Sequence, residues 1–192
     1  MNPEHEKLCG SPEWAAWLQS EILAALATGT ALGQDALEIG PGPGAATGWL
    51  AGRVTSLTAL EADPATAARL AARHPQVTVD TGDATAVPYP DGSFDSVASF
   101  TMLHHVPARE AQHRILSEAL RVLRPGGTLL GSDSLASNDL HHFHAGDVYN
   151  PVDPATLLIW LRSLGFTPVT ITVGDALMFT ARKPQRTAVS PA

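Results

Sequence analysis

A short glycine-rich stretch holds the residues of this chain that are best suited to bind a ligand. Gly40-Pro41-Gly42-Pro43-Gly44 follows the apolar run 36–39, which contains Glu38. A strand that enters a glycine loop and then a helix places backbone N–H groups and a helix N-terminus at the carboxyl edge of a sheet. Taken alone, this glycine spacing is compatible with several kinds of nucleotide ligand.

The residues in and around the loop indicate the charge of that ligand. A carboxylate at Glu38 would repel a pyrophosphate and would favour positive charge, such as the ammonium and sulfonium groups of S-adenosylmethionine. Pro41 and Pro43 lack the N–H donors that a pyrophosphate requires. Glu61 ends a second apolar run about 20 residues beyond the loop, where an acid can bind ribose hydroxyls. Each acid taken separately could be a solvated strand end, but the combination favours a cationic nucleoside without phosphate.

Five of the eight histidines fall in two groups, which are His104-His105 and His141, His142 and His144. Both groups follow predicted strands, so we expect them to face the crevice where open α/β sheets bind ligands. His104 and His105 are the predicted catalytic residues, one of them acting as a general base toward a substrate. The alternatives are that this pair only orients the ligand loop and that the second group lies in a solvated polar loop.

A metal site is a further interpretation of the same histidines. His142 and His144 with Asp147 could supply ligands, and His104 could join them across the crevice. The residues do not follow a recognised metal-binding spacing, so we expect no metal. Trp14 and Trp17 also leave two interpretations open, because they could close over a ligand or pack their helix onto the sheet.

The elements that position these residues alternate between apolar strands and Ala- and Leu-rich helices, which indicates an α/β fold. A first helix begins after Ser11, an N-cap residue followed by Pro12, and ends near Gly29. The segment 133–152 is polar, rich in histidine and long for a connector, so we expect a lid or binding loop there. The runs 166–173 and 176–181 surround Gly174-Asp175 as a hairpin. Five more strands are expected at 36–39, 57–61, 77–80, 94–100 and 128–132, and further helices at 45–51, 63–74, 110–123 and 153–164.

Several motifs in this order resemble those of class I S-adenosylmethionine-dependent methyltransferases, most closely the type 11 group that includes ubiquinone and menaquinone biosynthesis enzymes. The segment 37–44 resembles their first motif, and Gly82-Asp83-Ala84 is similar to the motif that flanks adenine. The segments 88–95, 103–106 and 123–127 complete the series, and the resemblance spans about residues 36 to 132.

The resemblance implies a fold, a cofactor and a set of binding residues. The expected fold is a Rossmann-like, seven-stranded, mostly parallel sheet with helices on both faces and an antiparallel last strand. The cofactor would be S-adenosyl-L-methionine. Its methionine part would lie against Glu38, Gly40 and Gly42, its ribose on Glu61 and its adenine between Asp83 and the Ala84 backbone. Arg53 and Arg109 are candidates for binding its carboxylate. The full predicted cofactor site is Glu38, Gly40, Gly42, Gly44, Glu61, Ala62, Asp83, Ala84 and Phe100.

Composition limits what else the chain could be. Its 192 residues, of which 44% are hydrophobic, suit one domain over 1–183, with a flexible tail at 184–192. The net charge of -7 argues against nucleic acid as a partner. The chain has no apolar run long enough for a membrane span and no signal peptide, and its one cysteine, Cys9, allows no internal disulfide, so we expect a cytoplasmic protein.

The predicted function is methyl transfer to a small-molecule acceptor, which the sequence does not identify. One alternative is a non-catalytic S-adenosylmethionine-binding module. The other is an NAD-dependent oxidoreductase, which the loop disfavours because it lacks the Gly-x-Gly-x-x-Gly spacing. The oligomeric state is left open.

Overall fold

The computed structural model describes residues 2–185. These residues form a seven-stranded sheet in the order β3-β2-β1-β4-β5-β7-β6. The strands from β1 to β5 pair in parallel, and β7 runs antiparallel to both of its neighbours. This arrangement confirms the predicted mostly parallel sheet with an antiparallel last strand. The strands are β1 (Asp35–Ile39), β2 (Ser56–Glu61), β3 (Thr78–Thr81), β4 (Phe94–Phe100), β5 (Leu123–Asp133), β6 (Val169–Val173) and β7 (Leu177–Arg182).

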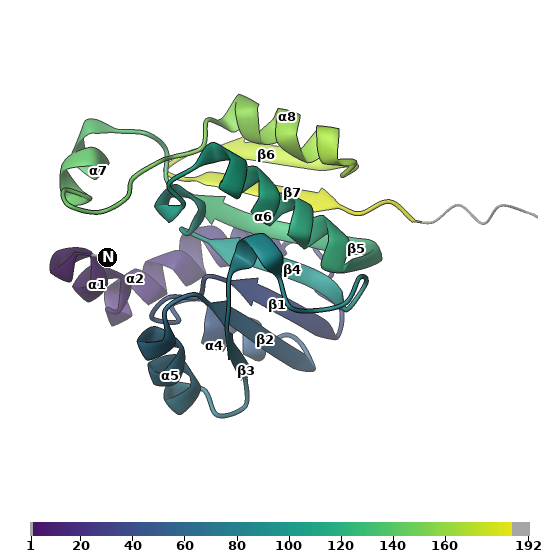
Figure 1. The fold of residues 1–192 in the computed structure, drawn as a ribbon, viewed down its shortest axis with the longest axis horizontal. Coiled ribbons are helices and arrows are strands. Elements are labelled where there is room, and N and C mark those ends of the chain that lie inside the picture. Colours follow the sequence, from purple (N-terminus) through teal and green to yellow (C-terminus); the bar gives the residue numbers. More distant parts are fainter. Residues whose placement is uncertain (1, 186–192) are drawn as a thin grey trace, which may run out of the picture.

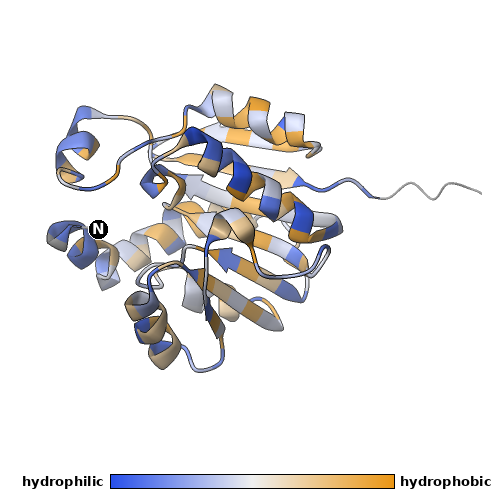
Figure 2. Cartoon of the chain, in the orientation of Figure 1, coloured by the Kyte–Doolittle hydropathy of each residue, from blue (hydrophilic) through white to orange (hydrophobic). Residues whose placement is uncertain are grey.

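Helices cover both faces of the sheet because the strands bury residues on both sides. In β1, Leu37 and Ile39 join one apolar cluster with residues of α6 and α8, whereas Ala36 joins a second cluster with residues of η1, α4 and α5. Figure 2 shows the apolar strands inside the molecule and hydrophilic residues on the outer face of α6. The helical elements are α1 (Pro3–Cys9), α2 (Pro12–Trp17), the π-helix η1 (Leu18–Leu23), α3 (Ala24–Ala27), α4 (Thr47–Ala51), α5 (Pro64–Arg73), the 3-10 helices η2 (Ala84–Ala86) and η3 (Leu103–His105), α6 (Arg109–Val122), α7 (Asn138–Phe143) and α8 (Pro154–Leu164).

Local sequence signals set several of the helix boundaries. The side chains of Ser11, Asp63 and Asp153 accept hydrogen bonds from backbone N–H groups in the first turns of α2, α5 and α8, and proline follows each of these caps. Gly165 ends α8 at a φ of 106°, a conformation that glycine adopts without strain. The expected hairpin is also present, since β6 pairs with β7 across the turn that contains Gly174.

The structure differs from the sequence prediction in three elements. The first helix is preceded by α1, and its middle turn is the π-helix η1, which buries Leu18, Ile22 and Leu23. β5 begins at Leu123, directly after α6, where a helix end and a loop were expected. The expected lid contains a short helix, α7, which Ser137 caps through the Leu140 N–H. Among the described residues, no helix has both the length and the apolar character of a membrane span.

The carboxyl ends of the parallel strands meet on one side of the molecule. In Figure 1, α1 and α7 lie on this side, to the left of the sheet, although the two helices are far apart in the sequence. Asn2 joins them, since its Nδ2 donates to the Phe143 carbonyl at 2.9 Å. The fold therefore encloses the carboxyl edge between its N-terminal helix and the 133–152 segment. Of the predicted tail, residues 186–192 lie outside the described part of the chain.

Candidate active site

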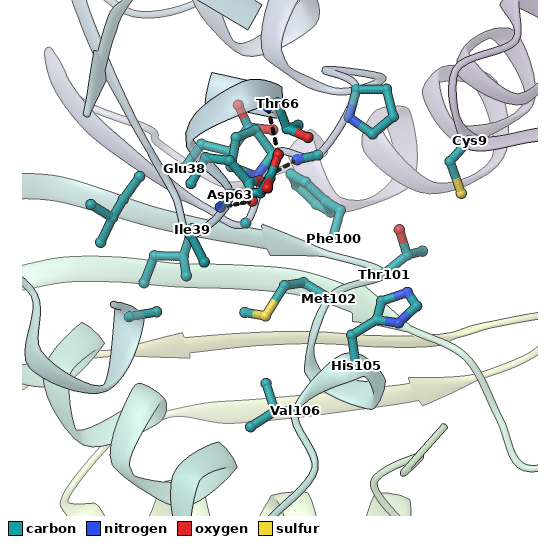
Figure 3. Close-up of a pocket in the computed structure, with 18 of the residues that line it drawn as sticks. Cys9, Glu38, Ile39, Asp63, Thr66, Phe100, Thr101, Met102, His105 and Val106 are labelled. Atoms are coloured by element: carbon teal, nitrogen blue, oxygen red, sulfur yellow. Dashed lines mark hydrogen bonds between the residues drawn. The ribbon is translucent and has the colours of Figure 1, made fainter. Parts of the chain in front are cut away.

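A cavity of about 920 Å³ lies at the carboxyl edge of the sheet. This volume is in the range of small-molecule sites. Figure 3 shows side chains from α1, the strand ends and the η3 region around it. Of the predicted site residues, it is lined by Glu38, Gly40, Gly42, Glu61, Ala62, Asp83, Ala84, Phe100 and His105.

Two predicted residues lie outside the cavity wall. Gly44 is turned toward α5, where an added Cβ would come within 2.5 Å of Leu70 Cδ1, so this glycine serves the packing of the loop. His104 is buried behind the wall, with its Nδ1 against the carboxylate of Asp133. The two arginines predicted as candidates for the cofactor carboxylate also do not line the cavity. They are Arg53, which stacks on Trp49, and Arg109. Arg69 of α5 does line it.

The glycine loop is held tightly against the sheet. The Gly40 N–H donates to the Leu60 carbonyl at 2.9 Å, and an added Cβ at Gly40 would come within 2.2 Å of Met102 Cγ. Gly42 has a φ of 53° and open space where a Cβ would be. The loop therefore presents bare backbone to the cavity at Gly42, as a close-fitting ligand requires.

Two carboxylates flank the loop. Glu38 is 2% exposed and accepts a hydrogen bond from Thr47 Oγ1 at 2.7 Å. Burial raises the pKa of Glu38 to about 7, and the nearby Glu61 adds to this effect. Glu61 accepts from the N–H groups of Gly42 and Asp63, both at 3.0 Å. A cation in the cavity would stabilise the ionised form of Glu38, so the donor and acceptor set fits the positively charged methionine end of S-adenosylmethionine.

The segment that carries Asp83 is anchored to α6. Arg121 donates to the carbonyls of Val87 and Tyr89, both at 2.8 Å, and Glu118 accepts from the Val87 N–H at 2.8 Å. Asp83 caps η2 through the Thr85 N–H at 2.7 Å. The compact stretch between Asp83 and Phe94 is thus fixed by side chains of a neighbouring helix, and the short η2 is its regular part.

The opposite end of the cavity is built from residues that the sequence did not single out as a group. Glu6 and Cys9 of α1 and Asp147 after α7 line it together with His105. In Figure 3, Thr101 and His105 lie next to each other, and Cys9 is on the α1 side of the cavity. Burial raises the pKa of the Cys9 thiol to about 11, so Cys9 is protonated at neutral pH and unsuited to act as a nucleophile.

Thr101, in the cavity wall after β4, has a φ of 50°, which is uncommon for a β-branched residue. Its N–H donates to the Ser132 carbonyl at 2.8 Å, which holds the strained turn in place. The turn carries the chain from β4 past the glycine loop and into η3. Sequence patterns do not reveal this conformation, because threonine there looks like an ordinary strand end.

Each of the two tryptophans fits one of the two interpretations, contact with a ligand site or packing of the helix. Their ring centroids are 5.0 Å apart in a stacked arrangement. Trp14 lines the cavity, and Trp17 packs against the apolar cluster of η1, α4 and α5.

The 133–152 segment is fixed at Asn150, whose N–H donates to the His104 carbonyl at 2.7 Å and whose Nδ2 donates to the Val106 carbonyl at 3.0 Å. The predicted lid is therefore docked on η3.

Comparison with known proteins identifies the family. A model described as a methyltransferase domain matches residues 37–131. A Mycolicibacterium smegmatis protein described as a probable S-adenosylmethionine-dependent methyltransferase is 38% identical over 100 residues, which cover 52% of this chain and 38% of that protein. The demethylmenaquinone methyltransferase of Beutenbergia cavernae is 35% identical over 105 residues, covering 54% of this chain and 42% of the enzyme. The chain thus spans less than half the length of both relatives.

Solved structures share the fold. Phosphoethanolamine N-methyltransferase 2 of Haemonchus contortus, in complex with S-adenosyl-L-methionine, superposes with a TM-score of 0.72 at 18% identity over 85% of this chain and 52% of that one. The [4+2]-cyclase SpnF gives a TM-score of 0.70 at 19% identity over 88% of this chain and 83% of that one. The matched family model, the relatives and the fold show that the chain belongs to the class I S-adenosylmethionine-dependent methyltransferases.

Proposed function

We propose that this protein transfers the methyl group of S-adenosylmethionine to a small-molecule acceptor. The observation that carries the proposal is the single cavity that joins the glycine loop and its two acids to a wall made by α1, His105 and Asp147. One end of this cavity suits a cationic nucleoside, and the other end is available for an acceptor. Since the fold also occurs in a cyclase, the proposal depends on the site and not on the fold alone.

The residues proposed to hold the cofactor follow from their places in the wall. Glu38, Gly40 and Gly42 would bind its methionine part, and Glu61 with Ala62 its ribose. Asp83 and the Ala84 backbone would bind the adenine, as the family resemblance implies, and Phe100, which lines the same cavity, would contact the cofactor. When bound, S-adenosylmethionine supplies a methyl group whose bond to sulfur breaks, leaving the electron pair on sulfur, while a lone pair of the acceptor bonds to the carbon and any displaced proton passes to water.

The histidines are proposed to contribute mainly by forming a wall that positions the acceptor, and not as general bases. His104 does not line the cavity, and the ring of His105 packs against His104 and His5 at centroid distances of 4.1 and 4.8 Å. Holding two reactants in line can account for about 7–11 kcal/mol of a barrier, whereas a general base contributes roughly 10²–10⁴-fold. Positioning by this wall is therefore sufficient for transfer to an already nucleophilic atom.

A small acceptor is supported by the enclosure of the site. Glu6 on α1 pairs with Arg69 on α5 at 3.1 Å, and both residues line the cavity. Asn2 and Asp147 join α1 to the segment after α7. These contacts narrow the approach for a folded protein or an RNA.

The first test is calorimetric titration of the protein with S-adenosylmethionine, S-adenosylhomocysteine and NAD. We expect micromolar binding of both adenosyl ligands, no binding of NAD, and affinity at least tenfold weaker in Glu61→Ala. Glu13→Ala is the matched control, because Glu13 is exposed on α2 and outside the cavity. Binding of NAD alone would support an oxidoreductase instead.

Turnover is measured next as release of S-adenosylhomocysteine in the presence of a panel of small nucleophiles. Methylation of at least one of them, abolished by the cofactor-site variant, is the expected result. Binding without turnover on any acceptor class would favour a non-catalytic cofactor-binding module. Methylation only of folded proteins or RNA would contradict the small-molecule acceptor.

A further inference from the structure

Four histidine side chains of the described chain meet beside the cavity, where α1, η3 and the end of α7 come together. The cluster consists of His5, His104, His105 and His144, and one ring nitrogen of each lies within 4.8 Å of those of the others. His5, His104 and His144 are at most 4% exposed, so the cluster is largely shielded from water. His141 and His142, also on α7, lie outside it.

In His104 and His144, hydrogen bonds at Nδ1 fix the orientation of the ring and leave Nε2 facing the cluster. His104 Nδ1 bonds to the carboxylate of Asp133, and His144 Nδ1 donates to the Leu140 carbonyl at 2.6 Å. This leaves His104 Nε2 and His144 Nε2 with lone pairs, and both atoms are buried without a hydrogen-bond partner among the described residues. Metal-bound histidines typically donate their second N–H to a carboxylate or a carbonyl in this way.

The charges around the cluster also suit a metal ion. Two carboxylates lie at the rim of the cluster, with Asp147 Oδ2 3.5 Å from His5 Nδ1 and Asp133 behind His104, so the surroundings favour a cation.

We propose that His5, His104, His105 and His144 together bind one divalent transition-metal ion. Four imidazole nitrogens suit Zn²⁺ in tetrahedral coordination. Nitrogens bound to one zinc lie about 3.3 Å apart, so the widest pair would move inward by about 1.5 Å on binding. Because all four positions are filled by protein, the site is structural, and it fastens α1 and α7 to η3 at the acceptor end of the cavity.

This inference does not rest on the proposed methyl transfer, because its readout is metal content. Protein purified without a histidine tag, loaded with Zn²⁺ and dialysed, should retain one equivalent by elemental analysis. His144→Ala should lose the bound zinc. His142→Ala should keep it, because His142, two residues earlier in α7, is exposed and outside the cluster. Equal zinc content in His144→Ala and the parent protein would overturn the proposal.

Two further measurements cover the case in which His144→Ala fails to fold. Titration of the unaltered protein with Co²⁺ should produce the intense visible absorption of a tetrahedral site at one equivalent, and absence of this spectrum would overturn the proposal. Asp133→Asn should lower the zinc affinity by about 10- to 100-fold, because Asp133 orients His104. Asp139→Asn is its control, since Asp139 is exposed on α7, and equal zinc affinities of the two variants would contradict the site.

Discussion

Glu38 is a buried acid that also lines the cavity. It lies in the interior strand β1, is 2% exposed, and accepts a hydrogen bond from Thr47 Oγ1 at 2.7 Å. Burial raises its pKa to about 7, so in the free protein this carboxyl is partly protonated near neutral pH. An acid with a raised pKa binds its proton more tightly when folded, so its contribution to the free energy of unfolding decreases as the pH rises from about 4.5 to about 7.

The same shift predicts a pH dependence of cofactor binding. A cation beside Glu38 favours the carboxylate, so binding expels the proton. Affinity for S-adenosylmethionine should therefore rise with pH below about 7, by up to tenfold per unit, and level off above it. Calorimetry between pH 5.5 and 8 (about the range that brackets this pKa) measures the slope, which Glu38→Gln should abolish. The same slope in both proteins would assign it to another group.

At the scale of elements, the sheet is packed tightly where β5 lies between β4 and β7. Gly131 has no room for a side chain, because an added Cβ would come within 2.3 Å of the Ser99 carbonyl oxygen and 2.4 Å of the Phe179 ring. Neither neighbour can move easily, since Ser99 is in the ladder of β4 and Phe179 is 1% exposed.

Gly131→Ala should therefore destabilise the fold by roughly 1–3 kcal/mol through overpacking. Gly174→Ala, in the hairpin turn, has nothing within 4 Å of the added methyl group and should change stability by less than about 0.5 kcal/mol. Urea unfolding of the two variants measures the difference. Similar midpoints would show that β5 can shift to accept the methyl group.

The contact between α6 and the segment after Asp83 supports a second prediction at this scale. Arg121→Ala removes the donors to the Val87 and Tyr89 carbonyls, and leaving such partly buried groups unpaired costs about 1–3 kcal/mol. Because the segment carries Asp83, we expect weaker cofactor binding as well as a lower urea midpoint. Arg162→Ala, an exposed arginine of α8 outside the cavity, is the control and should change neither. An unaltered cofactor affinity in the Arg121 variant would show that the position of Asp83 does not depend on the contacts of Arg121.

At the scale of the whole molecule, the fold consists of a two-faced sheet and a separate enclosure at its carboxyl edge. Both apolar clusters are built from residues that follow α1, the first being Leu18. The contribution of α1 is instead to the cavity, through Glu6 and Cys9. Core stability and site closure thus depend on different parts of the chain.

Removal of residues 1–9 should separate these two properties. We expect the urea midpoint to change little, because no residue of the apolar clusters is lost. Turnover, measured as release of S-adenosylhomocysteine, should fall at least tenfold, about 1.4 kcal/mol, because α1 forms one wall of the acceptor end of the cavity. Unfolding of the shortened protein would show that the contacts of Asn2 and His5 also support the core.

The sequence by itself determined the architecture and most of the residues that line the glycine-loop side of the cavity. Strand and helix periods, helix caps and the loop from Gly40 to Gly44 are patterns among near neighbours, so they are visible in one sequence. The positions of the acids Glu38, Glu61 and Asp83 in the cavity wall were predictable because each lies at or near the carboxyl end of a recognisable strand at the same edge of the sheet. Gly44 is the one predicted cofactor residue that does not line the cavity. It is turned toward Leu70 of α5, and the sequence does not reveal a contact with a separate helix.

Only the tertiary structure decided the other end of the cavity. His5, His104 and His144 come from three segments separated by about 100 and 40 residues, a distance over which no spacing rule applies. The sequence grouped His144 with its neighbours on α7 and had no signal for His5, and it could not tell that His104 turns toward Asp133 while His105 faces the cavity. The physical reason is that periodicity reports the contacts of one element with the core. Convergence of side chains from several elements depends on how those elements pack, and the packing of α1 and α7 against η3 exists only in the folded chain.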